Sequence, residues 1–225
     1  TAQAGLIRAT VGGLTGEARA RVIPPLPWSE DFESVPVDRA PAHWTNTTLK
    51  YFVREVDGNK LLVKRADNPF SFIKRARGFM GPTHLHDYTV EADVLATMPR
   101  RQVGDMGIVA QRYQLALFGA HQRLELQAWQ PETERTVAVP FPWKANTWYR
   151  MKLRVENLPD GTTRARGKVW LRGEPEPEAW TIEKVDRIPN RKGSPGIYGD
   201  APSHESNPNL RAEIFYDNFK VTPNR

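Results

Sequence analysis

Polar and aromatic side chains recur at alternate positions on both sides of residues 119–122. Alternate residues of an extended chain point to the same side, so this spacing predicts a face rich in hydrogen-bonding groups. Amides and charged groups can hold sugar hydroxyls, and an indole ring can stack on the apolar face of a sugar. The candidate ligand-binding residues are Gln111, Tyr113, Arg123, Glu125, Gln127 and Trp129, with Arg112 expected on the opposite face unless a bulge intervenes.

Two closely spaced histidines are the candidates for a zinc site. His84 and His86 flank one residue and precede Asp87. A catalytic zinc needs three protein ligands and an open position. The other histidines, at positions 43, 121 and 204, fall in different loops, and the chain contains no cysteine. The pattern therefore favours ordinary polar surface. The sequence also lacks a G-x-S-x-G elbow and the glycine-rich phosphate loops.

The stretch from Val103 to Trp129 must position the candidate ligand-binding residues. Apolar and polar residues alternate along it, and residues 119–122, Gly-Ala-His-Gln, are predicted to form a tight turn between two strands. On the last strand Leu124, Leu126 and Ala128 share the apolar face. The pattern predicts consecutive antiparallel strands with one face in a core and one face in water.

The rest of the chain after Trp28 shows short strand patterns separated by turn signals, with almost no helical periodicity. This pattern predicts an all-β fold, a jelly-roll β-sandwich of two antiparallel sheets. Strands are expected at 51–56, 61–65, 71–77, 88–96, 103–113, 114–118, 123–129, 135–139, 148–156, 164–171, 179–183 and 212–221. The proline-rich segment 186–210 is expected to be a long loop.

Residues 5–23 form a separate pattern, a hairpin around Gly12 and Gly13. A two-stranded hairpin is marginal alone, so it is expected to pack on a neighbour. The run Pro24-Pro25-Leu26-Pro27 predicts an extended spacer. We therefore expect residues 1–25 to be a hairpin and spacer, and residues 26–225 to be the sandwich. The missing N-terminal Met suggests a processed product or an excised piece.

The composition narrows the classes of partner. The 225 residues carry 32 basic and 26 acidic side chains, a net charge of +6. Basic residues are scattered among acids, and the densest cluster, residues 74–77, is short, so no nucleic-acid partner is expected. No apolar run approaches the roughly 18 residues needed to span a bilayer.

Several strings resemble a known family. SEDFES near the start, DGNKLLV, WYRMKLRVE and the closing FYDNFKV together resemble the concanavalin A-like lectin/glucanase sandwich, in its laminin-G-like bacterial branch. GIVAQRY, HQRLELQ, WQPETERTV and RGKVWLRGEPEP are similar to the C-terminal domain of bacterial proteins with a pyrroloquinoline-quinone-type β-propeller. The hairpin's VGGLTG resembles the end of a bacterial immunoglobulin-like domain. The resemblance implies a concanavalin A-like jelly-roll β-sandwich over residues 28–222.

The resemblance also implies that the first and last strands lie side by side. SEDFES would then approach FYDNFKV, which brings Asp31 or Glu33 towards Asp217 and Asn218. Related sandwiches often hold a structural calcium there, and calcium prefers six to eight oxygen ligands. Asp31 and Asp217 are therefore candidate calcium ligands, with a turn-capping role for Asp217 and Asn218 as the alternative.

The same sandwich occurs in laminarinase-type glucanases, whose signature is a strand carrying E-x-D-x-x-E. Residues Glu91 and Asp93 begin such a string, but Ala96 stands in place of the second glutamate. The retaining mechanism needs two carboxyl groups about 5–5.5 Å apart. Asp105 and Glu125, from neighbouring strands, are the best remaining pair.

These observations lead to two functional expectations. The first is a non-catalytic accessory domain of a larger exported bacterial protein, which binds a glycan or packs on neighbouring immunoglobulin-like or propeller domains in an extracytoplasmic compartment. The second is a glycoside hydrolase-like enzyme that uses carboxylates on the concave sheet. Beyond the candidate calcium, no cofactor is expected.

Overall fold

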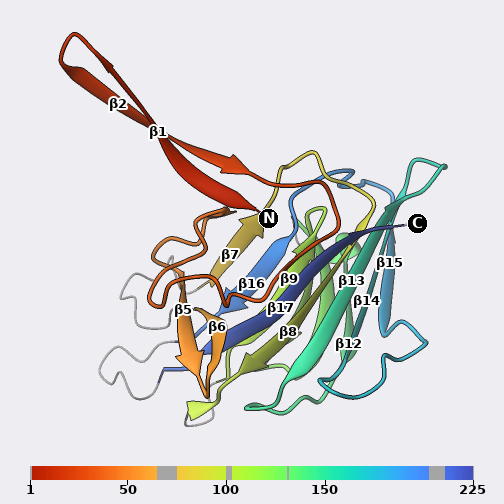
Figure 1. Cartoon of the computed structure of the whole chain (residues 1–225). Coiled ribbons are helices and arrows are strands. Elements are labelled where there is room, and N and C mark those ends of the chain that lie inside the picture. Colours follow the sequence, from red (N-terminus) through yellow and green to blue (C-terminus); the bar gives the residue numbers. More distant parts are fainter. Residues whose placement is uncertain (1, 65–74, 100–102, 131, 203–210, 225) are drawn as a thin grey trace.

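Two antiparallel sheets pack face to face in the computed structural model, and a separate hairpin projects from them (Figure 1). The structure describes residues 2–64, 75–99, 103–130, 132–202 and 211–224. The predicted all-β sandwich of two antiparallel sheets is confirmed. No helix in these ranges is long and apolar enough to cross a membrane.

The first sheet has seven strands and carries the residues of the central stretch. Its order is β12-β11-β10-β9-β16-β7-β4. The strands are β4 (Trp44–Thr45), β7 (Arg75–Met80), β9 (Asp105–Ala110), β10 (Tyr113–Phe118), β11 (Arg123–Ala128), β12 (Thr136–Pro140) and β16 (Gly196–Asp200). A short 3-10 turn, η2 (Thr133–Arg135), precedes β12.

The second sheet has eight strands in the order β15-β14-β13-β8-β17-β6-β5, with β3 also paired to β17. The strands are β3 (Trp28–Glu30), β5 (Tyr51–Val56), β6 (Asn59–Lys64), β8 (Tyr88–Ala96), β13 (Tyr149–Asn157), β14 (Thr163–Leu171), β15 (Ile182–Asp186) and β17 (Ile214–Pro223). Phe219 pairs with Glu30, so the first and last strands of the sandwich are neighbours, as predicted.

The core lies between the sheets because alternate residues of each strand point inward. Leu124, Leu126 and Ala128 of β11 belong to it, as the alternation predicts. Across the core, β14 approaches β10 so closely that a Cβ on Gly167 would lie 2.4 Å from Leu115 Cδ1. The core therefore fixes which face of β9, β10 and β11 is turned outward.

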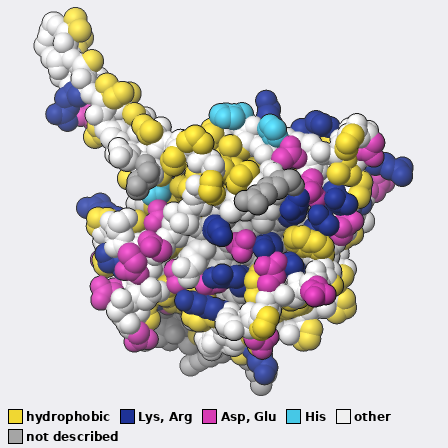
Figure 2. Space-filling model, turned by 45° about the vertical axis from the view of Figure 1, so that its right-hand side comes forward, with side chains coloured by type: hydrophobic (Ala, Val, Ile, Leu, Met, Phe, Trp, Pro, Cys, Tyr) yellow, Lys and Arg dark blue, Asp and Glu magenta, His cyan; other side chains and the backbone are white. Residues whose placement is uncertain are grey.

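The outer face of the eight-stranded sheet is a network of ion pairs. Arg150 contacts Asp93 at 2.6 Å, and Glu156 contacts Arg164 at 3.1 Å and Arg166 at 2.9 Å. Figure 2, which brings the right-hand side of Figure 1 forward, shows basic and acidic side chains intermingled over this part of the surface. Their charges largely compensate one another.

Two strand predictions differ from the structure. The segment 103–113 does not form one strand, because Gln111 and Arg112 make the turn between β9 and β10, both with positive φ. The segment 186–210 is not all loop, because β16 lies within it and fills the centre of the sheet between β9 and β7. In β16 only Ile197 and Tyr198 have side chains that favour a strand. Pairing with β9 on one edge and β7 on the other stabilises β16. Residues 71–74 and 203–210 lie outside the described ranges.

The N-terminal hairpin, β1 (Gln3–Val11) and β2 (Leu14–Val22), projects away from the sandwich (Figure 1). Its two strands pair with each other in one register. The following residues Ile23 and Leu26 pack against the main core. The predicted hairpin is confirmed, whereas the division into residues 1–25 and 26–225 stays a prediction.

Candidate ligand-binding face

The outer face of the seven-stranded sheet collects polar and aromatic side chains in two transverse rows. Cross-strand pairing aligns the first row as Ala138, Glu125, Ala116, Gly107, Tyr198 and Arg77. It aligns the second row as Thr136, Gln127, Gln114, Val109, Gly196, Phe79 and Thr45. Val109, Ala116 and Tyr198 pack together on this face, separate from the main core.

A hydrogen-bonded ribbon crosses this face from β7 to β11. Arg77 Nε donates to Gln114 Oε1 at 2.9 Å, and Gln114 Nε2 reaches Gln127 Oε1 at 3.5 Å. Gln127 in turn donates to Glu125, which also pairs with Arg123. Amide, carboxylate and guanidinium groups are thus held in fixed positions on the face, which is the arrangement that sugar hydroxyls require.

Arg77 reaches across the face and passes beside the Tyr198 ring. Its strand β7 is separated from Gln114 by β16 and β9, which contribute Gly196 and Gly107 to the two rows. Its guanidinium lies 5.5 Å from the Tyr198 ring centroid and 4.9 Å from that of Trp129. Burial lowers the pKa of Arg77 below its usual value. In the sequence Arg77 belongs to the short basic cluster at residues 74–77 and was expected to be ordinary surface charge. Its alternation with Arg75 was the one indication that both side chains share a face of a strand.

Trp129 forms the wall of an open pocket at one end of the face. Its side chain is 38% exposed, more than any of the other six tryptophans. The ring lies 6.1 Å from that of Phe79. The pocket has a volume of about 440 Å³ and is lined by Thr45, Phe79, Thr83, Arg112, Trp129, Lys192, Gly193 and Ser194. We call it the Trp129 pocket. An exposed indole ring beside hydroxyl and cationic groups can stack on a sugar ring.

Gln111 holds the β9–β10 turn and is not on the exposed face. It is fully buried; its amide accepts from Asp87 N at 2.9 Å and donates to Asn157 Oδ1 at 2.8 Å and to Asn190 O at 2.9 Å. The predicted place of Gln111 among the exposed groups is wrong, because it is a turn residue.

Arg112, the other turn residue, does reach the candidate face. Its guanidinium lies 5.6 Å from the Trp129 ring centroid. The expectation that Arg112 points to the opposite face is also wrong, because a turn residue does not follow the alternation of the strands.

Tyr113 likewise belongs to the interior. It is 1% exposed and pairs with Ala110 and Ala128, which places it on the apolar face. Its hydroxyl donates to Asp186 Oδ2 at 2.8 Å, and burial raises its pKa. The predicted position of Tyr113 on the ligand face is wrong because the register across the turn at residues 119–122 pairs Tyr113 with Ala128, a residue of the apolar face. Gln114 takes that position instead, and the sequence analysis missed it.

Asp105 and Glu125 both lie on the candidate face, but the prediction that they come from neighbouring strands is wrong, because β10 separates β9 from β11. Burial raises the pKa of Asp105 to about 6, and its carboxylate accepts from Gly119 N at 2.8 Å. Glu125 is buried and contacts Arg123 and Gln127. The residue of β9 that lies level with Glu125 is Gly107, two strand spacings or about 10 Å away. Asp105 lies two residues further along β9. The backbones of Asp105 and Glu125 are therefore further apart than those of two residues at alternate positions of one strand.

The partial glucanase string lies on the other sheet. Asp93 contacts Arg150 at 2.6 Å and Arg172 at 3.3 Å, and Glu91 contacts Lys152 at 3.4 Å. These carboxylates are neutralised by neighbouring arginine and lysine side chains. They therefore belong to the ion-pair network of the eight-stranded sheet rather than to the face with Trp129.

The candidate calcium residues are placed near the paired first and last strands. Asp217 accepts from Asn218 N at 2.7 Å and Asn59 Nδ2 at 3.2 Å, and burial raises its pKa. Asp31 accepts from Glu33 N at 3.2 Å, so local turns engage both carboxylates. Within the described ranges no group of three or more His, Asp or Glu side chains has a metal-binding arrangement. Calcium at Asp31 and Asp217 stays a prediction.

The histidines are separated in the described part of the chain. His86 Nδ1 lies 2.6 Å from Asp87 Oδ2, and His43 Nε2 lies 2.8 Å from Glu30 Oε2. His204 lies outside the described residues.

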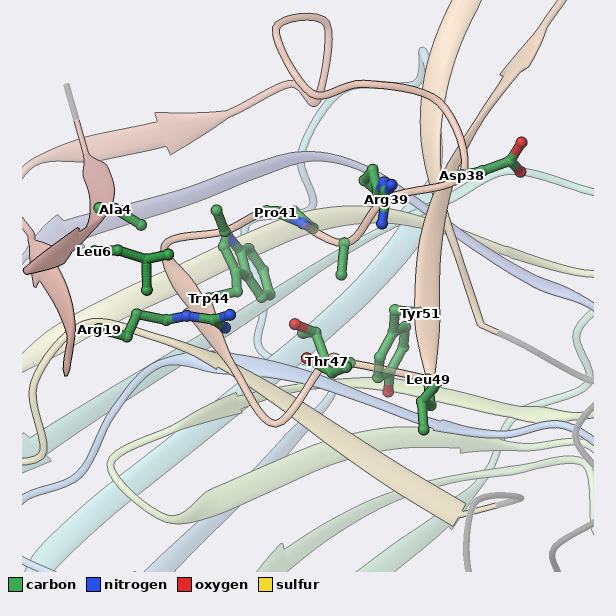
Figure 3. Close-up of a pocket in the computed structure, with 14 residues that line it drawn as sticks. Ala4, Leu6, Arg19, Asp38, Arg39, Pro41, Trp44, Thr47, Leu49 and Tyr51 are labelled. Atoms are coloured by element: carbon green, nitrogen blue, oxygen red, sulfur yellow. The ribbon is translucent and has the colours of Figure 1, made fainter. Parts of the chain in front are cut away.

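A second hollow of about 500 Å³ lies between the base of the hairpin and residues 38–51. Figure 3 shows Leu6 and Arg19 of the hairpin on one side near Trp44, and Thr47 and Tyr51 on the other. Trp44 and Tyr51 are each 2% exposed, so neither ring offers a face for stacking. The Trp129 pocket is therefore the stronger candidate for a sugar.

Comparisons with known proteins identify the fold. No protein-family model matches the chain, and no curated protein is significantly similar in sequence. Among solved structures, the Crh5 transglycosylase in its apo form superposes with a TM-score of 0.58 at 11% identity, over 88% of this chain and 85% of its own. This chain has the concanavalin A-like jelly-roll fold.

Two further structures share the fold. A glycosyl hydrolase family 16 protein from Mycobacterium smegmatis str. MC2 155 gives a TM-score of 0.54 at 14% identity, over 86% of this chain and 98% of that one. The carbohydrate recognition domain of Emp47p gives 0.54 at 10% identity, over 88% and 95%. At these identities the likeness establishes the fold alone. The relation to quinone-type propeller proteins stays a prediction.

Proposed function

We propose that this protein is a carbohydrate-binding module that holds an oligosaccharide on the outer face of the seven-stranded sheet. One observation carries the proposal: the exposed Trp129 ring stands at the end of the ribbon formed by Arg77, Gln114, Gln127 and Glu125. This combination offers both stacking and fixed hydrogen bonds. Fold neighbours named as a glycosyl hydrolase and a carbohydrate recognition domain support it.

The module is proposed to be non-catalytic. Glu125 already contacts Arg123 and Gln127, so protein groups engage its carboxylate and hold it in place. The ribbon around Glu125 therefore presents groups that can orient a ligand.

The experiment that tests this function is a glycan array with three proteins. The wild type is expected to retain one class of oligosaccharide. Trp129→Ala is expected to weaken that binding about tenfold, because stacking on an aromatic ring contributes about 0.5–1.5 kcal/mol. Trp180→Ala is the matched control, since Trp180 contacts Arg166 and Lys168 of the other sheet. Equal binding by the wild type and Trp129→Ala would contradict the proposal.

Hydrolysis of a glycan is the second candidate function, and the state of Asp105 favours it. A carboxyl whose pKa is about 6 can act as a general acid near neutral pH, with Glu125 as its partner. Their backbone separation suits an inverting geometry better than a retaining one. Analysis of products after incubation with the bound glycan distinguishes the two functions. Turnover that is lost in both Asp105→Asn and Glu125→Gln would establish the enzyme.

We also propose that the hairpin attaches the module to a neighbouring β domain of an exported polypeptide. One face of the hairpin is polar, with Arg8 paired to Glu17. The other face is apolar and exposed; its larger members are Ile7, Val11, Leu14 and Val22. Hydrogen exchange in the natural polypeptide tests this idea: β1 and β2 amides should exchange more slowly there than in the 225-residue chain. Unchanged exchange would contradict it.

A further inference from the structure

The charged groups around the Trp129 pocket are all cations. Arg112 and Lys192 are the charged residues among the described lining, and both side chains are exposed. In the described ranges neither forms an ion pair with a carboxylate. The Trp129 pocket therefore differs from the eight-stranded sheet, where arginines and lysines are paired with acids.

Arg77 is a third cation near the pocket, and it lies beside the Trp129 ring, as Arg112 does. The guanidinium carbons of Arg77 and Arg112 lie 4.9 Å and 5.6 Å from the Trp129 ring centroid. Arg77 bonds to the neutral amide of Gln114. Two cations beside one ring repel each other, and the ring quadrupole offsets only part of that repulsion. An anion bound to Arg112 would offset part of that repulsion.

The backbone holds Arg112 in place. The turn at Gln111 and Arg112 is fixed by the buried amide of Gln111. The segment that carries Lys192 packs directly on Arg112, because a Cβ on Gly193 would lie 2.6 Å from Arg112 Cγ. A larger residue at position 193 would push the two cations apart. The cationic end of the pocket is thus set by the fold before a ligand arrives.

We propose that the Trp129 pocket binds an acidic sugar residue, whose carboxylate or sulfate group is held by Arg112 and Lys192 while its ring stacks on Trp129. The inference rests on the proposed glycan binding and adds the class of sugar. A planar guanidinium matches a carboxylate or a sulfate through two parallel hydrogen bonds. A neutral sugar would leave Arg112 and Lys192 without an anionic partner.

Calorimetric titration with two matched pairs of ligands tests the proposal. One pair is pentagalacturonate and its methyl ester, and the other is a κ-carrageenan hexasaccharide and its desulfated form. We expect the wild type to bind one acidic form at least about tenfold more tightly than its neutral counterpart, with weaker binding at high salt. Arg112→Gln and Lys192→Gln should each reduce this ratio about three- to fivefold.

Two controls separate the outcomes. Lys220→Gln removes one exposed cation from the other sheet and should leave the ratio unchanged; Lys192→Gln, at an exposed loop position, should leave the melting temperature unchanged. If the array finds a neutral glycan that depends on Trp129, and neither acidic form is preferred, the acidic-sugar inference is overturned while glycan binding stands. If no glycan binds, both fall.

Discussion

Arg77 shows how a single side chain organises the candidate face. It leaves β7, crosses above two strands, and meets Gln114 and Trp129 on the far side. The strands that it crosses contribute Tyr198, Gly107 and Gly196 to this face. At Gly107 an added Cβ would lie 2.3 Å from Leu115 O, and at Gly196 it would lie 2.1 Å from Gly78 O. The close packing of the strands beneath Arg77 therefore depends on these glycines.

Asp105 provides a prediction about pH. The pKa of its carboxyl rises from about 3.9 in an unfolded chain to about 6 in the folded protein. Between these values the folded state holds the extra proton, so this group lowers stability as the pH rises from about 4 to about 6. Asp105→Asn keeps an oxygen that can accept from Gly119 N–H. We expect the variant to be more stable by up to about 2 kcal/mol at about pH 7.5.

Urea denaturation at several pH values measures this difference. The two proteins should converge near pH 4, where the wild-type carboxyl is protonated in the folded state. A variant that is less stable than the wild type at about pH 7.5 would show that the ionised form of Asp105 is favoured instead.

At this scale the sequence predicted part of the site. The alternation of Arg123, Glu125, Gln127 and Trp129 placed all four on one face, and the structure agrees. Gln111 could not be placed, because alternation is valid only within a strand and Gln111 lies in a turn. Tyr113 was misplaced because the four-residue turn at 119–122 pairs it with Ala128. The turn formed by Gln111 and Arg112 contains no glycine that would mark it in the sequence.

At the scale of elements, the β9–β10 turn joins stability to the site. Gln111 supports the turn from beneath, and Arg112 reaches the Trp129 ring from above. The sequence could not reveal this, because the partners of Gln111 come from Asp87, Asn157 and Asn190, far along the chain. Strand β16 was missed for a similar reason: it is short, and its neighbours on both sides stabilise it.

Gln111→Ala is therefore expected to destabilise the protein by about 2–3 kcal/mol, because it leaves buried hydrogen-bonding groups without partners. Gln127→Ala is the matched control on the exposed face, with an expected cost below about 1 kcal/mol. Chemical denaturation measures both. If Gln111→Ala lost affinity for a glycan with no loss of stability, Gln111 would be a ligand contact after all.

At the scale of the whole molecule, the sandwich and the hairpin are almost independent. The strands β1 and β2 are exposed along nearly their whole length. A hydrogen bond from Arg21 Nε to Ala42 O, at 3.2 Å, links the hairpin to the sandwich. The sequence predicted both the sandwich and the hairpin, because period-two alternation and turn residues are local signals. It could not predict the direction in which the hairpin projects.

Removal of residues 3–22 is expected to shift the melting temperature of the sandwich by less than about 3 °C, since exposed residues contribute little to stability. Differential scanning calorimetry of the shortened and complete chains measures the shift. A fall of more than about 8 °C would mean that the hairpin is part of the cooperative unit.

The central claim, that a glycan binds on the outer face of the seven-stranded sheet at Trp129, is tested most directly by the indole N–H signals in a nitrogen–proton NMR spectrum. The glycan selected by the array is added to saturation. The account predicts that the Trp129 signal moves, while those of Trp148 and Trp180, which contact arginines of the other sheet, stay in place. Movement at Trp148 or Trp180 with an unchanged Trp129 signal would contradict it.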